Sequence, residues 1–175
     1  VLMTQTSHLT GTDRCAEVLS HFPDHDVVIN IQGDEPLVAA EQLDQLLAAF
    51  QDQEVQIATI VNPEVTHADL QNINRIKVIA NARQNAIYFS RSPLPNMHYA
   101  KDPQFPWLRH IGLYAYRAKT LLDLAQLQPC ALEQAESLEQ IRWLYYGYQI
   151  RLVCSHIETP NIDVPADVEK VLPFL

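Results

Sequence analysis

The sequence predicts an α/β fold with a largely parallel sheet, and two observations lead to this prediction. Short apolar runs of strand length alternate with stretches of helical periodicity along most of the chain, which is the order that βα units produce. The run Val27–Ile31 is apolar at almost every position, as expected of a strand that helices cover on both faces. The 175 residues, 1–175, suit one domain without internal repeats or linkers.

The first half of the chain gives a regular series of elements. Strand-length apolar runs lie at residues 1–4, 27–31 and 55–61. The helices expected between them cover residues 12–22 and 40–50, where apolar side chains repeat along one side. Thr10 and Asp13 have the spacing of a capping box, which places the start of the first helix.

The middle of the chain departs from this series. Residues 76–80 and 86–90 read as strands, and the turn-like NARQN between them predicts an antiparallel hairpin. Residues 93–106 contain four prolines and few apolar residues, which is typical of a long functional loop. The remaining elements are expected as strands at 111–116 and 150–154 and helices at 121–127, 135–146 and 164–171.

Composition excludes several classes of protein. Hydrophobic residues make up 47% of the chain and charged residues 19%, so the chain can form a core. A net charge of −9 argues against a nucleic-acid partner, which needs basic surfaces. No apolar run reaches the roughly 20 residues of a membrane span. Cys15, Cys130 and Cys154 are widely spaced without a CxxC pair, which favours reduced thiols in a cytoplasmic protein.

The strand Val27–Ile31 runs directly into the polar segment QGDEP. In an open parallel sheet, ligands bind at the carboxyl ends of the strands, so Asp34 and Glu35 follow a strand where a site is expected. A carboxylate there can hold Mg²⁺ together with phosphate oxygens. The pattern by itself favours a turn in which Asp34 is a cap and Glu35 is solvated or serves the turn, so the metal role needs further support.

Other polar residues stand near predicted strand ends or helix starts. The segment HLTGTDR places small residues before a helix, where backbone N–H groups attract phosphate or base edges, although such a turn can be a helix cap alone. Five further positions have both a functional and a structural interpretation: Arg91 at a strand end, His110 at a strand start, Glu136 and Glu139 on a helix flank, and Asp163 before a helix.

Taken together and in this order, the stretches GTDR, VVINIQGDEP, YFSRSPLP, LRHIGLYAYR, LEQAESLEQIRWLYYG and IDVPADVEKV resemble the 3-deoxy-manno-octulosonate cytidylyltransferases, or CMP-Kdo synthetases, over essentially the whole chain. The resemblance implies a Rossmann-like α/β nucleotidyltransferase fold and a homodimer in the bacterial cytoplasm. It implies a Mg²⁺-dependent enzyme that transfers CMP from CTP to 3-deoxy-D-manno-octulosonate (Kdo), releasing pyrophosphate, for lipopolysaccharide biosynthesis. The strands around the hairpin and the segment RHIGLYAYR are expected to build the dimer, because their aromatic residues are of a type enriched in interfaces: Tyr88, Phe89, Trp107, Tyr114 and Tyr116.

The resemblance also implies roles for individual residues. Asp34 and Asp163 are the catalytic carboxylates that hold Mg²⁺. The residues implied in CTP binding are Gly11, Thr12, Arg14 and Gln32. Those implied around Kdo are Arg91, His110, Tyr114, Glu136, Glu139 and Gln140.

The chain departs from the family pattern at three places. Thr10 stands where the family has Ser, and PNIDVPADV is shorter around Asp163 than the family's GVDTPEDL segment. Family members begin with two further βα units carrying a triphosphate loop, so we expect an N-terminally truncated chain that by itself is inactive and aggregates. Two alternatives remain open: a sialic-acid type of cytidylyltransferase, and a non-catalytic nucleotide- or sugar-binding module.

Overall fold

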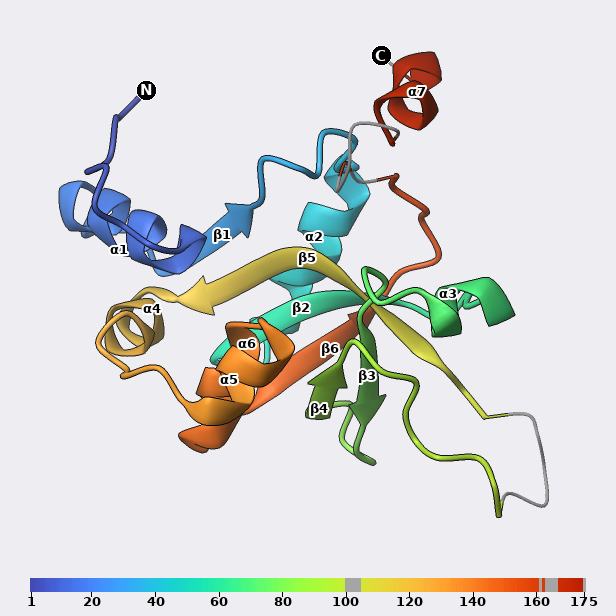
Figure 1. Ribbon diagram of the computed structural model, residues 1–175. Helices are drawn as coiled ribbons and strands as arrows, with labels where there is room; N and C mark the ends of the chain where they lie inside the picture. Colours follow the sequence, from blue (N-terminus) through green and yellow to red (C-terminus); the bar gives the residue numbers. More distant parts are fainter. Residues whose placement is uncertain (100–104, 161, 163–166, 175) are drawn as a thin grey trace.

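The computed structural model describes residues 1–99, 105–160, 162 and 167–174, and these form a six-stranded sheet flanked by helices (Figure 1). The strands are β1 Val27–Ile31, β2 Ile57–Asn62, β3 Lys77–Ala80, β4 Ala86–Ser90, β5 Leu108–Arg117 and β6 Ile150–Cys154. The helices are α1 Gly11–His21, α2 Ala40–Ala49, α3 His67–Gln71, α4 Ala118–Leu124, α5 Ala131–Glu136, α6 Gln140–Tyr145 and α7 Val168–Val171, followed by the 3-10 helix Leu172–Phe174. The α/β class predicted from the sequence is confirmed.

The strand pairing corrects the prediction of a largely parallel sheet. The long strand β5 crosses the sheet (Figure 1) and pairs antiparallel with β1, β2 and β3. Since β6 is parallel to β2, the strands β1, β2, β3 and β6 share one direction, and β5 is inserted among them in the opposite one. Among the strand pairs of the described residues, only β2 and β6 pair in parallel, and the other pairs are antiparallel. An apolar run has the same pattern in either direction, so periodicity could not reveal this insertion.

The two faces of the sheet have separate cores. On one face, α2 packs Leu46 and Phe50 against strand residues that include Ile60 and Leu113. On the other face, α1, α4 and α6 bury their apolar residues around Tyr116 and the fully enclosed Trp143. Successive residues of β2 alternate between the two cores, and every one of them is buried. This is the double coverage that an uninterrupted apolar strand indicates.

Several predicted elements need correction. Residues 1–4 form no strand, with Val1, Leu2 and Met3 exposed, and the short helix α3 was not predicted. The helix expected over 135–146 is two helices, because Ser137 has a left-handed backbone with φ 52° that ends α5. The β3–β4 hairpin is confirmed. Of the helix expected over 164–171, residues 164–166 lie outside the described residues and α7 is present.

The aromatic residues expected at a dimer interface lie mostly in the core. Phe89, Tyr114 and Tyr116 are at most 5% exposed, because they pack under α6 rather than on the surface. They give no support to the predicted dimer. Within the described residues, no helix combines the length and the apolar character that crossing a membrane requires.

Candidate active site

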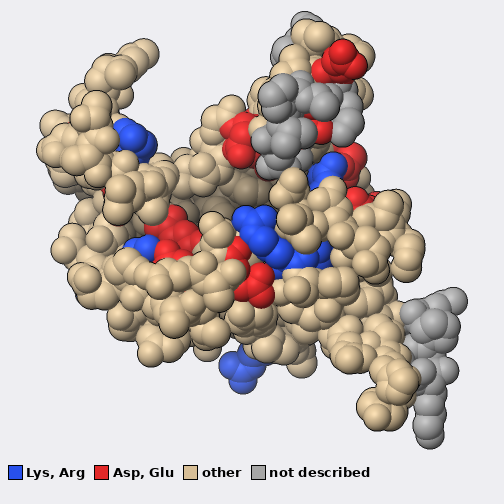
Figure 2. Space-filling view, viewed as in Figure 1, with Lys and Arg blue, Asp and Glu red and all other residues tan. Residues whose placement is uncertain are grey.

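A cavity of about 500 Å³ opens beyond the carboxyl end of β1, beside the first half of β5. Figure 2 shows the hollow in the middle of this face, with acidic and basic side chains around it. The cavity brings together eight of the residues predicted from the sequence: Thr12, Gln32, Asp34, Arg91, His110, Tyr114, Glu139 and Gln140. These residues come from segments far apart in the sequence, so the fold gathers the motifs at one place.

The QGDEP segment forms the turn at the end of β1. The N–H of Glu35 donates to the carbonyl of Gln32 at 3.1 Å and closes the turn. Asp34 is exposed at the edge of the cavity, whereas Glu35 is buried and accepts the N–H of Gly112 on β5 at 3.4 Å. Glu35 therefore does more than serve the turn, because it fixes the turn against the central strand.

The start of α1 meets the start of α6 at the cavity wall. The predicted capping box is present, with the N–H of Asp13 donating to the Thr10 hydroxyl at 3.1 Å. It begins the helix so that Thr12, 1% exposed, donates its hydroxyl to Glu139 Oε2 at 2.9 Å. Burial raises the pKa of Glu139, and the hydrogen bond from Thr12 opposes that rise.

Gly11 lies where the start of α1 passes close to the end of β1. A Cβ added at Gly11 would lie 3.1 Å from Asn30 Nδ2 and 3.4 Å from Gln32 Nε2. A residue with a Cβ would therefore require the Asn30 side chain to shift by a few tenths of an ångström. Gly11 does not itself line the cavity, but it allows Thr12 and Gln32 to do so.

The face of β5 toward the cavity carries a half-buried histidine among aromatic rings. The His110 ring lies 5.2 Å from both the Phe89 and Tyr114 rings. Burial and then the charge of Arg109 lower the pKa of His110 to about 3, so the ring is neutral. Burial likewise raises the pKa of the Tyr114 phenol, which stays protonated.

Arg91 lines the cavity but is held by main-chain carbonyls. Its Nε donates to the Glu136 carbonyl at 2.7 Å, and its two terminal nitrogens donate to Ile73 at 3.0 Å and Ser137 at 3.3 Å. The Glu136 side chain does not line the cavity. Its carboxylate instead accepts the Ser90 hydroxyl at 2.7 Å and the Arg91 N–H at 2.9 Å, so it holds the end of β4 in place.

Sequence reasoning missed a second group of charged residues at the cavity. Arg109 is buried and forms an ion pair with Glu158, which also lies 3.9 Å from Arg75. Burial lowers the pKa of Arg109, and the charge of Glu158 opposes this shift. Arg75, Arg91 and Arg109 line the cavity together with the carboxylates Asp34, Glu35 and Glu139, so the wall offers cationic groups that can meet the anionic part of a ligand. The adjacency of Arg109 to His110 in LRHIG was the available signal.

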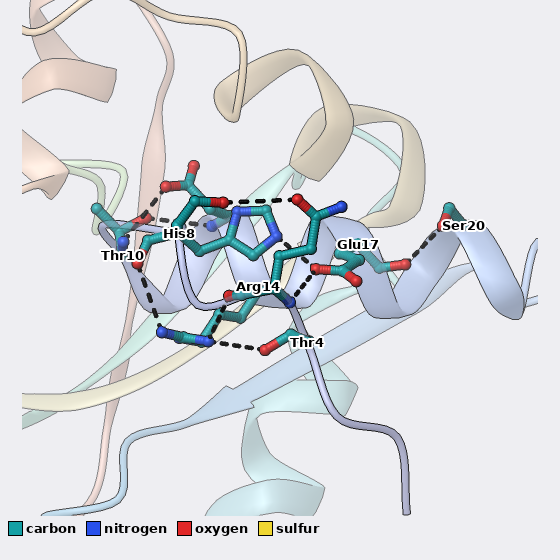
Figure 3. Close-up of polar contacts among 9 residues, drawn as sticks. Thr4, His8, Thr10, Arg14, Glu17 and Ser20 are labelled. Carbon is teal, nitrogen blue, oxygen red and sulfur yellow. Dashed lines mark hydrogen bonds and ion pairs between the residues drawn. The ribbon is translucent and has the colours of Figure 1, made fainter.

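Arg14 is the predicted nucleotide-binding residue that the structure places away from the cavity. Figure 3 shows its guanidinium turned toward the N-terminal segment, where it donates to the Thr4 hydroxyl at 2.8 Å and the Gln5 carbonyl at 3.1 Å. In the same view, His8 contacts Glu17 at 2.5 Å. The residues around Arg14 thus fix the segment before α1, and its role toward CTP stays a prediction.

The metal prediction depends on two carboxylates, of which Asp163 lies outside the described residues. Asp34 offers an exposed carboxylate at the cavity edge, and its main-chain carbonyl accepts the N–H of Ile162 at 2.9 Å. The described residues contain no group of three or more candidate ligands. Mg²⁺ needs only one or two protein carboxylates when phosphate oxygens complete its shell, so the donor at Asp34 fits this ion.

Comparisons with known proteins show which family the chain resembles. A profile of the family described as cytidylyltransferase matches residues 1–152. The chain is 45% identical to the 3-deoxy-manno-octulosonate cytidylyltransferase of Parabacteroides distasonis, over 100% of this chain and 73% of that protein. It is 44% identical to the enzyme of the same name from Bacteroides thetaiotaomicron, with the same coverage.

A solved structure shares the whole described fold. The structure of CMP:2-keto-3-deoxy-manno-octonic acid synthetase complexed with CTP is 38% identical, has a TM-score of 0.90, and is matched over 99% of this chain and 70% of that chain. At this identity and coverage, the likeness extends beyond a shared fold. The chain belongs to the cytidylyltransferase family, among the 3-deoxy-manno-octulosonate cytidylyltransferases.

Proposed function

We propose that this protein transfers CMP from CTP to Kdo, giving CMP-Kdo and pyrophosphate for lipopolysaccharide biosynthesis. The observation that carries the proposal is that residues from the family motifs line one shared cavity: Gln32 and Asp34 from the end of β1, His110 and Tyr114 from β5, and Glu139 and Gln140 from the start of α6. A sialic-acid type of enzyme is less well supported, because the relatives that match the full chain are named for Kdo.

In this reaction the anomeric hydroxyl of Kdo attacks the α-phosphorus of CTP. The new O–P bond forms as the bond to the β-phosphate bridging oxygen breaks, so pyrophosphate leaves with the electron pair and the hydroxyl proton is released. The chain's contribution is to hold the two anionic substrates in contact and in line. The arginines on the cavity wall offset the repulsion between them.

The Kdo side of the site combines a cation with neutral and acidic groups. Arg91 retains N–H groups beyond the three donated to carbonyls, so it can still meet the sugar carboxylate. Donors and acceptors for the sugar hydroxyls come from His110, Tyr114, Glu139 and Gln140. Glu136 holds Arg91 in place by accepting its main-chain N–H. Gly11, Thr12, Arg14 and Gln32 form the nucleotide side of the proposal.

Mg²⁺ is the cofactor in this proposal, and Asp34 with Asp163 would hold it. When bound, the ion screens the triphosphate charge and favours attack at the α-phosphorus. Asp34 supports this role because its carboxylate stands at the cavity edge, next to the backbone contact with Ile162. We further propose a cytoplasmic homodimer; light scattering that gives a monomer mass at tens of micromolar would contradict the dimer.

The experiment is direct detection of the product by mass spectrometry. The protein, CTP and Mg²⁺ are incubated with Kdo or, in a parallel reaction, with N-acetylneuraminic acid. We expect CMP-Kdo and an equal amount of pyrophosphate, and little CMP-sialic acid. A preference for sialic acid would contradict the substrate, and binding of CTP without any product would favour the non-catalytic alternative.

A further inference from the structure

A buried threonine on β2 contacts the cavity histidine from behind. Thr59 is fully buried and lies 3.0 Å from His110, measured from Oγ1 to Nε2. The same hydroxyl oxygen lies 2.8 Å from the Leu113 carbonyl and 3.3 Å from the Ile111 carbonyl. Thr59 is not part of the cavity wall and has no role in the function proposed above.

The proton of the Thr59 hydroxyl can be placed from these distances. A carbonyl oxygen only accepts, so a hydroxyl oxygen 2.8 Å from the Leu113 carbonyl must donate its proton there. If the proton instead pointed at His110, the Thr59 hydroxyl oxygen and the Leu113 carbonyl oxygen would face each other in a buried site without a proton between them. Such an unsatisfied contact between two acceptors is costly. Thr59 therefore accepts, and His110 Nε2 carries the proton.

The other nitrogen of the ring, Nδ1, remains to be assigned. A neutral imidazole has one N–H and one lone pair, and the lowered pKa of His110 keeps it neutral. With the proton on Nε2, Nδ1 is an acceptor. Within the described part of the chain, Nδ1 has no hydrogen-bond partner and is not among the enclosed polar atoms, so it is open to the cavity that His110 lines.

We propose that Thr59 is a positioning residue, which fixes His110 in the Nε2–H tautomer so that Nδ1 accepts a hydrogen bond from a hydroxyl of the sugar substrate. An acceptor at this point selects for a donor, so it disfavours a carboxylate or phosphate oxygen in the same place. The contacts of the ring with Phe89 and Tyr114 hold its plane, while Thr59 sets which nitrogen is protonated. The identity of the sugar rests on the function proposed above.

The test has one arm without substrate and one with it. A two-bond ¹H–¹⁵N spectrum of the histidine side chains reports which nitrogen of His110 is protonated. We expect the Nε2–H pattern in the wild type and in Thr59→Ser, and its loss in Thr59→Val. Thr120→Val, a buried threonine on α4 away from the cavity, is the matched control and should keep the wild-type pattern.

The kinetic arm separates positioning from a general loss of structure. Thr59→Val should raise the KM for Kdo by about three- to tenfold, the usual effect of one lost hydrogen bond, with the KM for CTP unchanged. Thr59→Ser should restore the wild-type value.

Protonated Nδ1 in the wild type would overturn the inference without any variant, as would Thr59→Val with an unchanged KM for Kdo. A wild type that makes no CMP-Kdo would overturn the proposed function instead, and the tautomer spectrum would still decide the role of Thr59.

Discussion

The hydrogen bond between Thr12 and Glu139 is the contact that joins two helix starts across the cavity wall, and Thr12→Val removes it with almost no change in volume. The Thr12 hydroxyl is buried and donates to Glu139 Oε2 at 2.9 Å. Hydrogen bonds to charged groups contribute about 1.5–3 kcal/mol. Because Glu139 is only half-buried, we expect the lower part of this range, about 1.5–2 kcal/mol.

The loss should depend on pH in a direction that follows from the pKa of Glu139. Burial raises that pKa above its usual value of 4.5, and Thr12 opposes the rise by favouring the carboxylate. Between the usual and the raised pKa, the unfolded chain releases its proton while the folded chain keeps it, so stability falls as pH rises. Removing Thr12 raises the folded pKa further. The penalty of Thr12→Val is therefore small below pH 4.5 and reaches its full value above the raised pKa.

The assay is thermal unfolding of the wild type, Thr12→Val and Thr12→Ser, followed by circular dichroism at acidic and neutral pH. At neutral pH, Thr12→Val should unfold about 3–8 °C lower in a thermal scan, and Thr12→Ser should remain close to the wild type. Adding Glu139→Gln to Thr12→Val should remove the pH dependence. Equal stability of the Val and Ser variants at neutral pH, or a penalty that does not change with pH, would refute the reasoning.

Three further changes test the site. Asp34→Asn should lower kcat by about two orders of magnitude at saturating Mg²⁺, the scale of losing a preorganised charge at the reacting centre, while circular dichroism stays unchanged; unaltered turnover would remove Asp34 from the metal site. Arg91→Ala should weaken Kdo binding by about 2–5 kcal/mol in calorimetry and CTP binding much less; equal losses would assign Arg91 to the phosphates or to structure. Gly11→Ala should destabilise the fold by about 1–3 kcal/mol, because its Cβ would lie 3.1 Å from Asn30 Nδ2. The control Gly33→Ala, whose Cβ would meet nothing within 4 Å, should be neutral. Identical unfolding midpoints for the two variants would show that the contact at Gly11 is relieved without cost.

The parts of the fold that the sequence predicts are those set by neighbouring residues. The capping box at Thr10, the strand Val27–Ile31 with its polar turn, and the β3–β4 hairpin each depend on a few consecutive side chains. The break at Ser137 was missed because Leu138, Ile141 and Leu144 keep one apolar stripe through it. A left-handed serine leaves that periodicity unchanged.

The sequence predicted which residues belong to the site, but not how their side chains contact one another. Asp34 was predicted because the apolar strand Val27–Ile31 runs directly into a polar segment. The other residues were predicted from the family resemblance. Their contacts were not, because Thr12 and Glu139 are 127 residues apart and meet only through the packing of α1 beside α6. Thr59 gave no signal, since it lies inside an apolar strand, and Arg109 was passed over because it stands next to a more conspicuous histidine.

The central claim is that one cavity holds Kdo between β5 and the start of α6, with CTP at the end of β1. The most direct measurement is the crystal structure of the protein with CTP, Mg²⁺ and Kdo. The account predicts the sugar hydroxyls within hydrogen-bond distance of His110, Glu139 and Gln140, with one hydroxyl on His110 Nδ1 and the metal on Asp34. Kdo bound outside this cavity, or a phosphate group in contact with His110 Nδ1, would contradict it.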